Sequence, residues 1–112
     1  MVKHEIRAYS SYSRDALHLL AQMIRRARIE RKLTTQELAD RAGISRGLVR
    51  RIERGEPGCA IGAVFETAAI VGVRLFDADQ PTIAAHLSAY SATLALMPKT
   101  VRPSGGKVKD DF

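Results

Sequence analysis

The sequence of 112 residues has no tryptophan, a single cysteine and few aromatic side chains, which make up only 5% of the chain. With Cys59 alone, no internal disulfide can form, and no cysteine–histidine pair has metal-ligand spacing. The shortage of rings means that the core must be built mostly from Leu, Ile, Val and Ala. No apolar run is long enough for a signal peptide or a membrane span, so we expect a soluble cytoplasmic protein without a membrane or metal partner.

Signatures of catalysis are also missing. Gly55, Gly58 and Gly62 lack the Gly-Lys-Ser/Thr ending of a phosphate-binding loop. There is no plausible catalytic triad and no cofactor fingerprint, and the three histidines are scattered along the chain. We therefore expect a protein that is not an enzyme, with no catalytic residues and no cofactor.

Positive charge, by contrast, is concentrated in one stretch. Residues 25–54 hold ten basic and four acidic side chains, which accounts for the whole net charge of +6. A basic patch of this kind favours an anionic partner, although a solvated helix face would look the same by charge alone.

Periodicity predicts an all-α protein of about five helices. Residues 13–79 are expected to form one domain, followed by a separate C-terminal helix. The predicted elements are an arm at 1–12, helices from the N-cap Ser13 to near Lys32 and at 35–42, 46–54, 60–71 and 80–97, a strand at 73–77, and a flexible tail at 98–112.

The segment 34–56 has the pattern of a helix, a turn and a second helix. Thr34 followed by Glu37 fits a capping box at the start of the first helix, and Gly43 fits the left-handed residue that ends it. Ser45 can cap the second helix. The apolar residues expected at the helix crossing are Leu38, Ala39, Ile44, Val49 and Ile52.

Two elements after this segment are candidates for pairing. A lone strand at 73–77 cannot satisfy its own backbone, so we expect it to pair with its copy in a second subunit or with the N-terminal arm. In the helix 80–97, a seam of apolar residues recurs at steps of four and three. This seam suits either an intramolecular core or a dimer contact. It consists of Ile83, Leu87, Tyr90, Leu94 and Met97.

With these residues, the chain resembles the lambda-repressor-like, Xre-type helix-turn-helix family over about residues 17–72. The resemblance implies a sequence-specific DNA-binding protein whose second helix of the motif enters the major groove. It also implies that Arg28 and Glu53 form a buried ion pair between two helices. The residues that it assigns to DNA binding are Thr34, Thr35, Gln36, Ser45, Arg46, Gly47, Arg50 and Arg51.

Two positions depart from the family pattern. The family commonly has Gln where this chain has Thr35, with Gln36 one place later, which puts the phosphate contact there in doubt. Gly47 lacks the side chain that often contacts a base, and a closer backbone approach could replace that contact. Arg46 is the strongest candidate for reading a base, because arginine can donate two hydrogen bonds to guanine, although a phosphate contact is the alternative.

The C-terminal part resembles HipB-type antitoxins, which partner HipA-type kinase toxins. The resemblance rests on the strand-like run VRLFD and on the final KVKDDF. It implies a homodimer that represses its own operon and binds the kinase. A twofold dimer would read a palindromic operator. In the tail, Phe112 could enter an apolar pocket of the kinase while Asp110 and Asp111 meet basic residues; the alternative is a disordered tail with no partner. The alternatives are a standalone repressor without a toxin, and an interaction protein that does not bind DNA.

Overall fold

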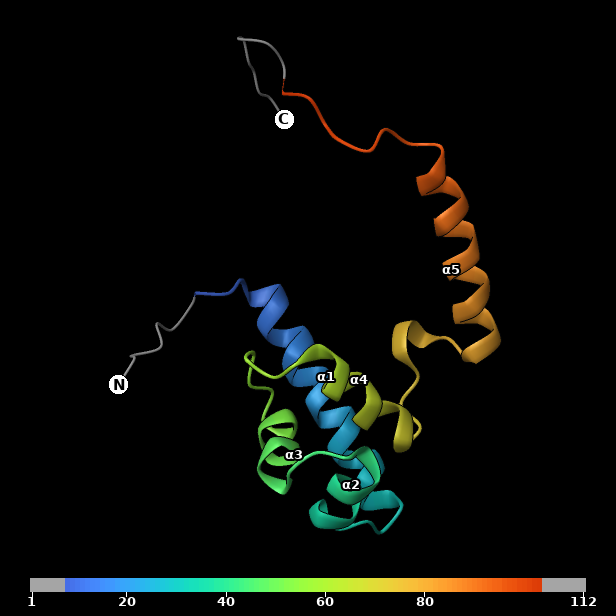
Figure 1. Ribbon diagram of the computed structural model, residues 1–112. Coiled ribbons are helices and arrows are strands. Elements are labelled where there is room, and N and C mark those ends of the chain that lie inside the picture. Colours follow the sequence, from blue (N-terminus) through green and yellow to red (C-terminus); the bar gives the residue numbers. More distant parts are fainter. Residues whose placement is uncertain (1–7, 104–112) are drawn as a thin grey trace. The chain divides into compact units, whose positions relative to one another are not determined.

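The computed structural model describes residues 8–103, and all the regular structure in this range is helical (Figure 1). The prediction of an all-α protein with about five helices is confirmed. The chain divides into two compact units between Asp77 and Ala78, and each is described here by itself. The helices are α1 (Ser11–Glu30), α2 (Thr35–Ala42), α3 (Arg46–Glu53), α4 (Ile61–Ile70) and α5 (Gln80–Ala95), with one 3-10 turn, η1 (Leu75–Asp77).

Helix α1 begins earlier than the sequence pattern indicated. Ser10, not Ser13, is the N-cap, and its hydroxyl oxygen accepts a hydrogen bond from the backbone N–H of Ser13 at 3.2 Å. Serine suits either position, and the earlier cap lets the helix gain almost one more turn. Part of the predicted arm at 1–12 is therefore helical, and residues 1–7 lie outside the described range.

The first unit is built around a small aliphatic core. Helix α2 packs against α3 and α4, and α1 packs against α3. Every helix of this unit contributes to the core, which contains no aromatic ring. The buried hydrophobic cluster consists of Ile24, Leu38, Ala39, Val49, Ile52, Ala68 and Val71.

The predicted strand at 73–77 is wrong: the described residues contain no strand. The backbone N–H of Val73 bonds to the carbonyl of Ala68 at 2.9 Å and closes the end of α4. Phe76 and Asp77 both have a φ of 54°, so the chain turns back as η1 instead of extending. A strand here would have no ladder partner among residues 8–103, whereas this turn satisfies its backbone locally. The alternation that indicated a strand comes from burial, since Val73 and Leu75 are half-buried and Arg74 and Phe76 are exposed.

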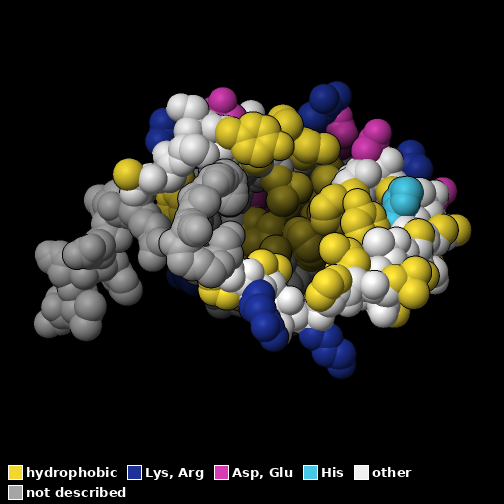
Figure 2. Space-filling model, turned by 90° about the horizontal axis from the view of Figure 1, so that it is seen from above, with side chains coloured by type: hydrophobic (Ala, Val, Ile, Leu, Met, Phe, Trp, Pro, Cys, Tyr) yellow, Lys and Arg dark blue, Asp and Glu magenta, His cyan; other side chains and the backbone are white. Residues whose placement is uncertain are grey.

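Large apolar side chains are nevertheless exposed on the first unit. Phe76 is 81% exposed and meets Phe65 edge to face, with ring centroids 6.3 Å apart. Next to this pair, an open hollow of about 430 Å³ is lined mainly by apolar side chains, including Leu20 and Met23. Hydrophobic side chains are abundant on the face shown in Figure 2.

Helix α5 is the regular element among the described residues of the second unit. Asp79 caps it by accepting a hydrogen bond from the backbone N–H of Thr82 at 3.0 Å, and Pro81 lies in its first turn. The helix ends at Ala95, two residues before the predicted end at Met97, and none of its residues is buried. No helix within residues 8–103 is both long enough and apolar enough to cross a membrane.

Candidate nucleic-acid interface

Helix α2 begins with a complete capping box. The Thr34 hydroxyl oxygen accepts from the backbone N–H of Glu37 at 3.0 Å, and the Glu37 carboxylate accepts from the backbone N–H of Thr34 at 2.8 Å. Two of the free amide groups at the helix start are thereby satisfied. This arrangement fixes the entry of α2, and Thr34 and Gln36 lie exposed beside it, whereas Thr35 is half-buried.

A three-residue turn joins α2 to α3. Gly43 has a φ of 70° and a ψ of 31°, the left-handed conformation that residues with a side chain adopt at a cost. The next backbone N–H, of Ile44, reaches back to the carbonyl of Ala39 at 3.1 Å. Ser45 then caps α3, accepting from the backbone N–H of Leu48 at 3.0 Å. The short turn thus holds the start of α3 in a fixed position next to α2.

The two sides of α3 differ sharply. Val49 is fully buried and Ile52 is 3% exposed, whereas the opposite side presents basic side chains to solvent. Its exposed residues are Arg46, Gly47, Arg50 and Arg51.

The three arginines of this exposed side have no partner within the described part of the chain. No hydrogen bond or ion pair joins the side chain of Arg46, Arg50 or Arg51 to another described residue. Arg54, just after the helix, instead pairs with Glu56 at 2.8 Å. The three guanidinium groups on the exposed side of α3 are therefore available to an external anion.

Arg28 and Glu53 meet in a bidentate ion pair between α1 and α3. The Arg28 Nε and Nη2 atoms donate to the Glu53 carboxylate at 2.7 and 3.0 Å, and the Nη1 atom donates to the carbonyl of Leu33 at 2.8 Å. The two side chains are only 12% and 6% exposed. Hydrogen bonds to Glu53, together with its charge, raise the pKa of Arg28 against the opposing effect of burial, so the guanidinium stays charged.

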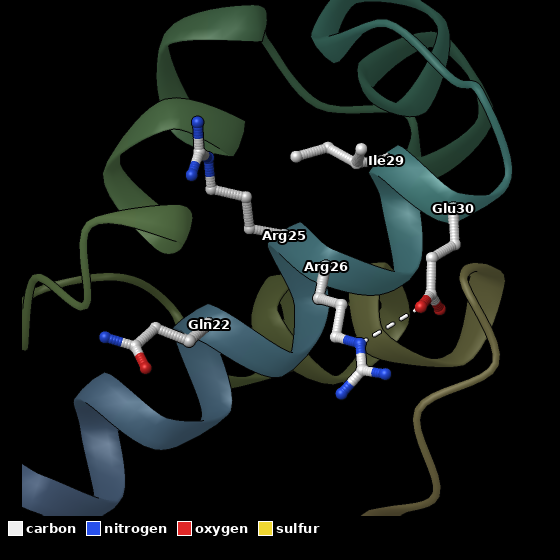
Figure 3. Close-up of a pocket in the computed structure, with 5 residues that line it drawn as sticks. All are labelled: Gln22, Arg25, Arg26, Ile29 and Glu30. Carbon is white, nitrogen blue, oxygen red and sulfur yellow. Dashed lines mark hydrogen bonds and ion pairs between the residues drawn. The ribbon is translucent and has the colours of Figure 1, made fainter.

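Helix α1 places a second arginine near Glu53. Arg25 extends toward α3 (Figure 3), and its Nε atom lies 4.0 Å from the Glu53 carboxylate, although the Arg25 side chain is 62% exposed. Arg26 points elsewhere and pairs with Glu30 at 3.0 Å. Glu53 thus faces two guanidinium groups, of which the exposed one is the weaker partner.

Two interactions of this surface were not predicted from the sequence. The side-chain amide of Gln36 donates to Asp40 at 2.8 Å, which its spacing of four residues on a helix could have indicated. The Arg54–Glu56 pair crosses the end of α3 at Gly55, where no regular spacing applies. Neither interaction involves Arg46, Arg50 or Arg51.

The predicted toxin-binding residues Asp110, Asp111 and Phe112 lie outside the described residues. Within residues 8–103, no group of three His, Cys, Asp or Glu side chains is placed to hold a metal ion.

Residues 24–58 match a protein family described as Helix-turn-helix. The match begins in α1, spans α2 and α3, and ends in the loop before α4, so it covers the capping box, the Gly43 turn and the exposed arginines. No curated protein and no solved structure matches the chain. The match does not extend to the C-terminal tail, where the likeness to HipB-type antitoxins resides. In residues 24–58, the family match and the observed arrangement of α2, the Gly43 turn and α3 therefore agree on a helix-turn-helix.

Proposed function

We propose that this protein is a sequence-specific transcriptional repressor that reads the major groove of DNA with the start of α3. The observation that supports this most is the set of three unpaired arginines on one side of α3. The other side of this helix is held by the aliphatic core and by the Arg28–Glu53 pair. A helix whose buried side is held by the core and whose exposed side is basic is suited to contact base edges and phosphates together.

Each exposed group of the motif has a proposed task. Arg46 and Arg50 reach base edges, and Arg51 contacts phosphate. Ser45 keeps the groove-facing start of α3 in place through its cap. At the start of α2, the positive end of the helix dipole and the side chains of Thr34, Thr35 and Gln36 bind a phosphate of the backbone. Gly47 lets the DNA backbone approach closely.

Gly47→Ala tests the close approach without disturbing the fold. An added Cβ would lie 3.9 Å from the Ser45 hydroxyl oxygen and near no other atom, so the free protein accommodates it. Alanine should even stabilise the helix by up to about 1 kcal/mol. A loss of DNA affinity at unchanged or higher thermal stability would support the close approach, and unchanged affinity would refute it.

Arg46→Ala tests base reading, with Arg54→Ala as the matched control, since Arg54 is already paired with Glu56. We expect Arg46→Ala to relax the sequence preference at one base pair by about 1–3 kcal/mol, measured against single-base variants of a selected site. Arg54→Ala should leave that preference unchanged. If Arg46→Ala instead weakened binding to all sequences equally, its role would be a phosphate contact.

One helix-turn-helix reads few base pairs, so we further propose that a homodimer binds a palindromic operator. Two recognition helices about 34 Å apart would enter successive major grooves on one side of the duplex. Binding should then fall steeply with salt, because every phosphate contact releases counterions. A salt-independent affinity would argue for an interaction protein instead.

The repressor is also proposed to be the antitoxin of a HipA-type kinase. What supports this is the sequence of the tail, whose closing KVKDDF is similar to that of HipB-type antitoxins. Phe112 would enter an apolar pocket of the kinase, and Asp110 and Asp111 would meet basic residues. The alternative is a standalone repressor of the Xre family.

A pull-down from native cells separates the two, using the tagged chain with and without its last ten residues. A kinase-sized partner captured only by the full chain would support the antitoxin role and the tail contact. Capture by both would move the contact to the folded units. Capture by neither would favour the standalone repressor.

A further inference from the structure

The four helices of the first unit end in the same way, but one of them ends on a different kind of residue. After each last turn, one residue has a positive φ, and the next backbone N–H bonds to a carbonyl five residues earlier. Glycine takes this left-handed position after α2, α3 and α4, at Gly43, Gly55 and Gly72. After α1 the position belongs to Lys32, which has a φ of 60°.

A left-handed lysine carries a backbone cost that glycine would avoid. In this conformation the Cβ atom lies too close to the following carbonyl oxygen, which is why glycine is usual at such a helix end. The Lys32 side chain does not offset this cost within the first unit, because it is exposed and its ammonium group makes no hydrogen bond or ion pair with a described residue of that unit. A strained residue whose charge stays unpaired in this way indicates a task outside the fold.

The place of Lys32 in the chain indicates what its charge meets. The turn between α1 and α2 holds two cations, and the other, Arg31, has its guanidinium against the backbone of Gly72 at the end of α4. Lys32 lies two residues before Thr34, at the part of the motif that the proposed function places against the DNA backbone. An ammonium group on a flexible stem suits a phosphate better than a base edge, because it is a point charge without a fixed direction. Given the proposed function, on which this inference rests, we infer that Lys32 binds a phosphate of the DNA backbone and is kept in its strained conformation for that charge.

Lys32→Gly separates this role from a structural one, because it should change stability and DNA binding in opposite directions. Glycine releases the left-handed strain, so the midpoint of thermal unfolding should rise by about 2–8 °C. Loss of the charge should lower the affinity for a selected duplex about 3–10-fold and make the slope of log K against log salt concentration shallower by about 0.9. The loss of affinity should be equal for single-base variants of the site, since a phosphate contact does not read sequence.

Three further variants separate the charge from the backbone strain. Lys32→Arg keeps both, so its affinity and its unfolding midpoint should stay near the wild-type values. Lys32→Ala keeps the strain and removes the charge, so it should lose affinity as Lys32→Gly does, without the gain in stability. Arg26→Ala is the matched control: it removes one positive charge from α1, but Arg26 already pairs with Glu30, so the salt slope should not change.

Neutral phosphates locate the contact on the duplex. In a series of duplexes that each carry one methylphosphonate, one should weaken wild-type binding without weakening Lys32→Gly further, because the two changes remove the same interaction. If every methylphosphonate weakened both proteins equally, the inference would be overturned.

The outcomes also distinguish this inference from the proposed function. Wild-type protein that binds no duplex would overturn both. Wild-type binding together with an unchanged salt slope for Lys32→Gly would overturn the inference alone, and so would an equal change of slope in Arg26→Ala. A lower unfolding midpoint for Lys32→Gly would assign the lysine to the stability of the fold and overturn the inference as well.

Discussion

The first unit of this protein and helix α5 use the same kinds of apolar side chain in opposite ways. In the first unit, aliphatic residues are buried, charges lie outside or pair, and α1, α2 and α3 each begin with a capping side chain. In α5, equally apolar residues are open to solvent and no charged residue accompanies them. The comparison teaches that hydrophobicity alone does not tell where a helix obtains its stability. The first unit obtains it by burying such residues around one core, whereas no residue of α5 is buried.

The largest effect is expected from breaking the buried Arg28–Glu53 ion pair of the first unit. Glu53→Gln keeps the shape of the side chain but leaves the Arg28 guanidinium buried without a countercharge, so the free energy of unfolding should fall by about 3–5 kcal/mol. The matched control Glu30→Gln breaks the exposed pair with Arg26 and should cost less than about 1 kcal/mol. Urea unfolding measures both, and equal losses would contradict the distinction.

The fall in the free energy of unfolding caused by Glu53→Gln should not depend on pH in the neutral range. Folding raises the pKa of Arg28, so its contribution to stability is fully present below the unfolded value and disappears only as the pH rises beyond that value. From about pH 6 to about pH 9 the guanidinium is charged in both states.

Truncating one leucine in each region tests the comparison directly. Leu38 is fully buried in the first unit, and Leu38→Ala should lower the free energy of unfolding by about 2–5 kcal/mol through lost burial and a cavity. Leu94 in α5 is 64% exposed, and Leu94→Ala should change it by less than about 0.5 kcal/mol. Thermal unfolding should be followed at a concentration at which the chain is monomeric. A large effect of Leu94→Ala under that condition would show that α5 obtains stability within the chain.

The ends of helices differ between the regions too, with a smaller expected effect. Helix α2 needs a left-handed residue at Gly43, whereas the C-cap of α5, Leu96, has an ordinary φ of −94°. An added Cβ at Gly43 meets nothing within 4 Å, so Gly43→Ala should cost about 1–2 kcal/mol for backbone conformation alone.

Gly58→Ala is the control for that change, because its Cβ also meets open space and its φ is not positive. It should alter the free energy of unfolding by less than about 0.5 kcal/mol. If the two alanine variants were equally stable, the left-handed conformation at residue 43 would have no measurable backbone cost.

Much of the first unit could be predicted from the sequence because its signals are local. Thr34 with Glu37, and Gly43 after Ala42, mark helix ends through hydrogen bonds and backbone angles that involve only neighbouring residues. The start of α1 was misplaced by three residues because Ser10 and Ser13 carry the same local signal. The strand at 73–77 was wrong for a different reason. Its alternation reflects packing against the aliphatic core, and side-chain periodicity does not report the backbone angles that turn the chain at Phe76.

The sequence by itself determined the helices, the caps of α2 and α3 and the concentration of positive charge in residues 25–54, because propensity, capping and composition act over a few residues. Only the tertiary structure decided which of those charges remain free. Arg54 is paired with Glu56 and Arg28 with Glu53, while the α3 arginines pair with no described residue. It also decided that the chain turns back at Phe76, where the sequence indicated a strand. Pairing and burial depend on where distant residues meet in space, and spacing along the chain does not encode that.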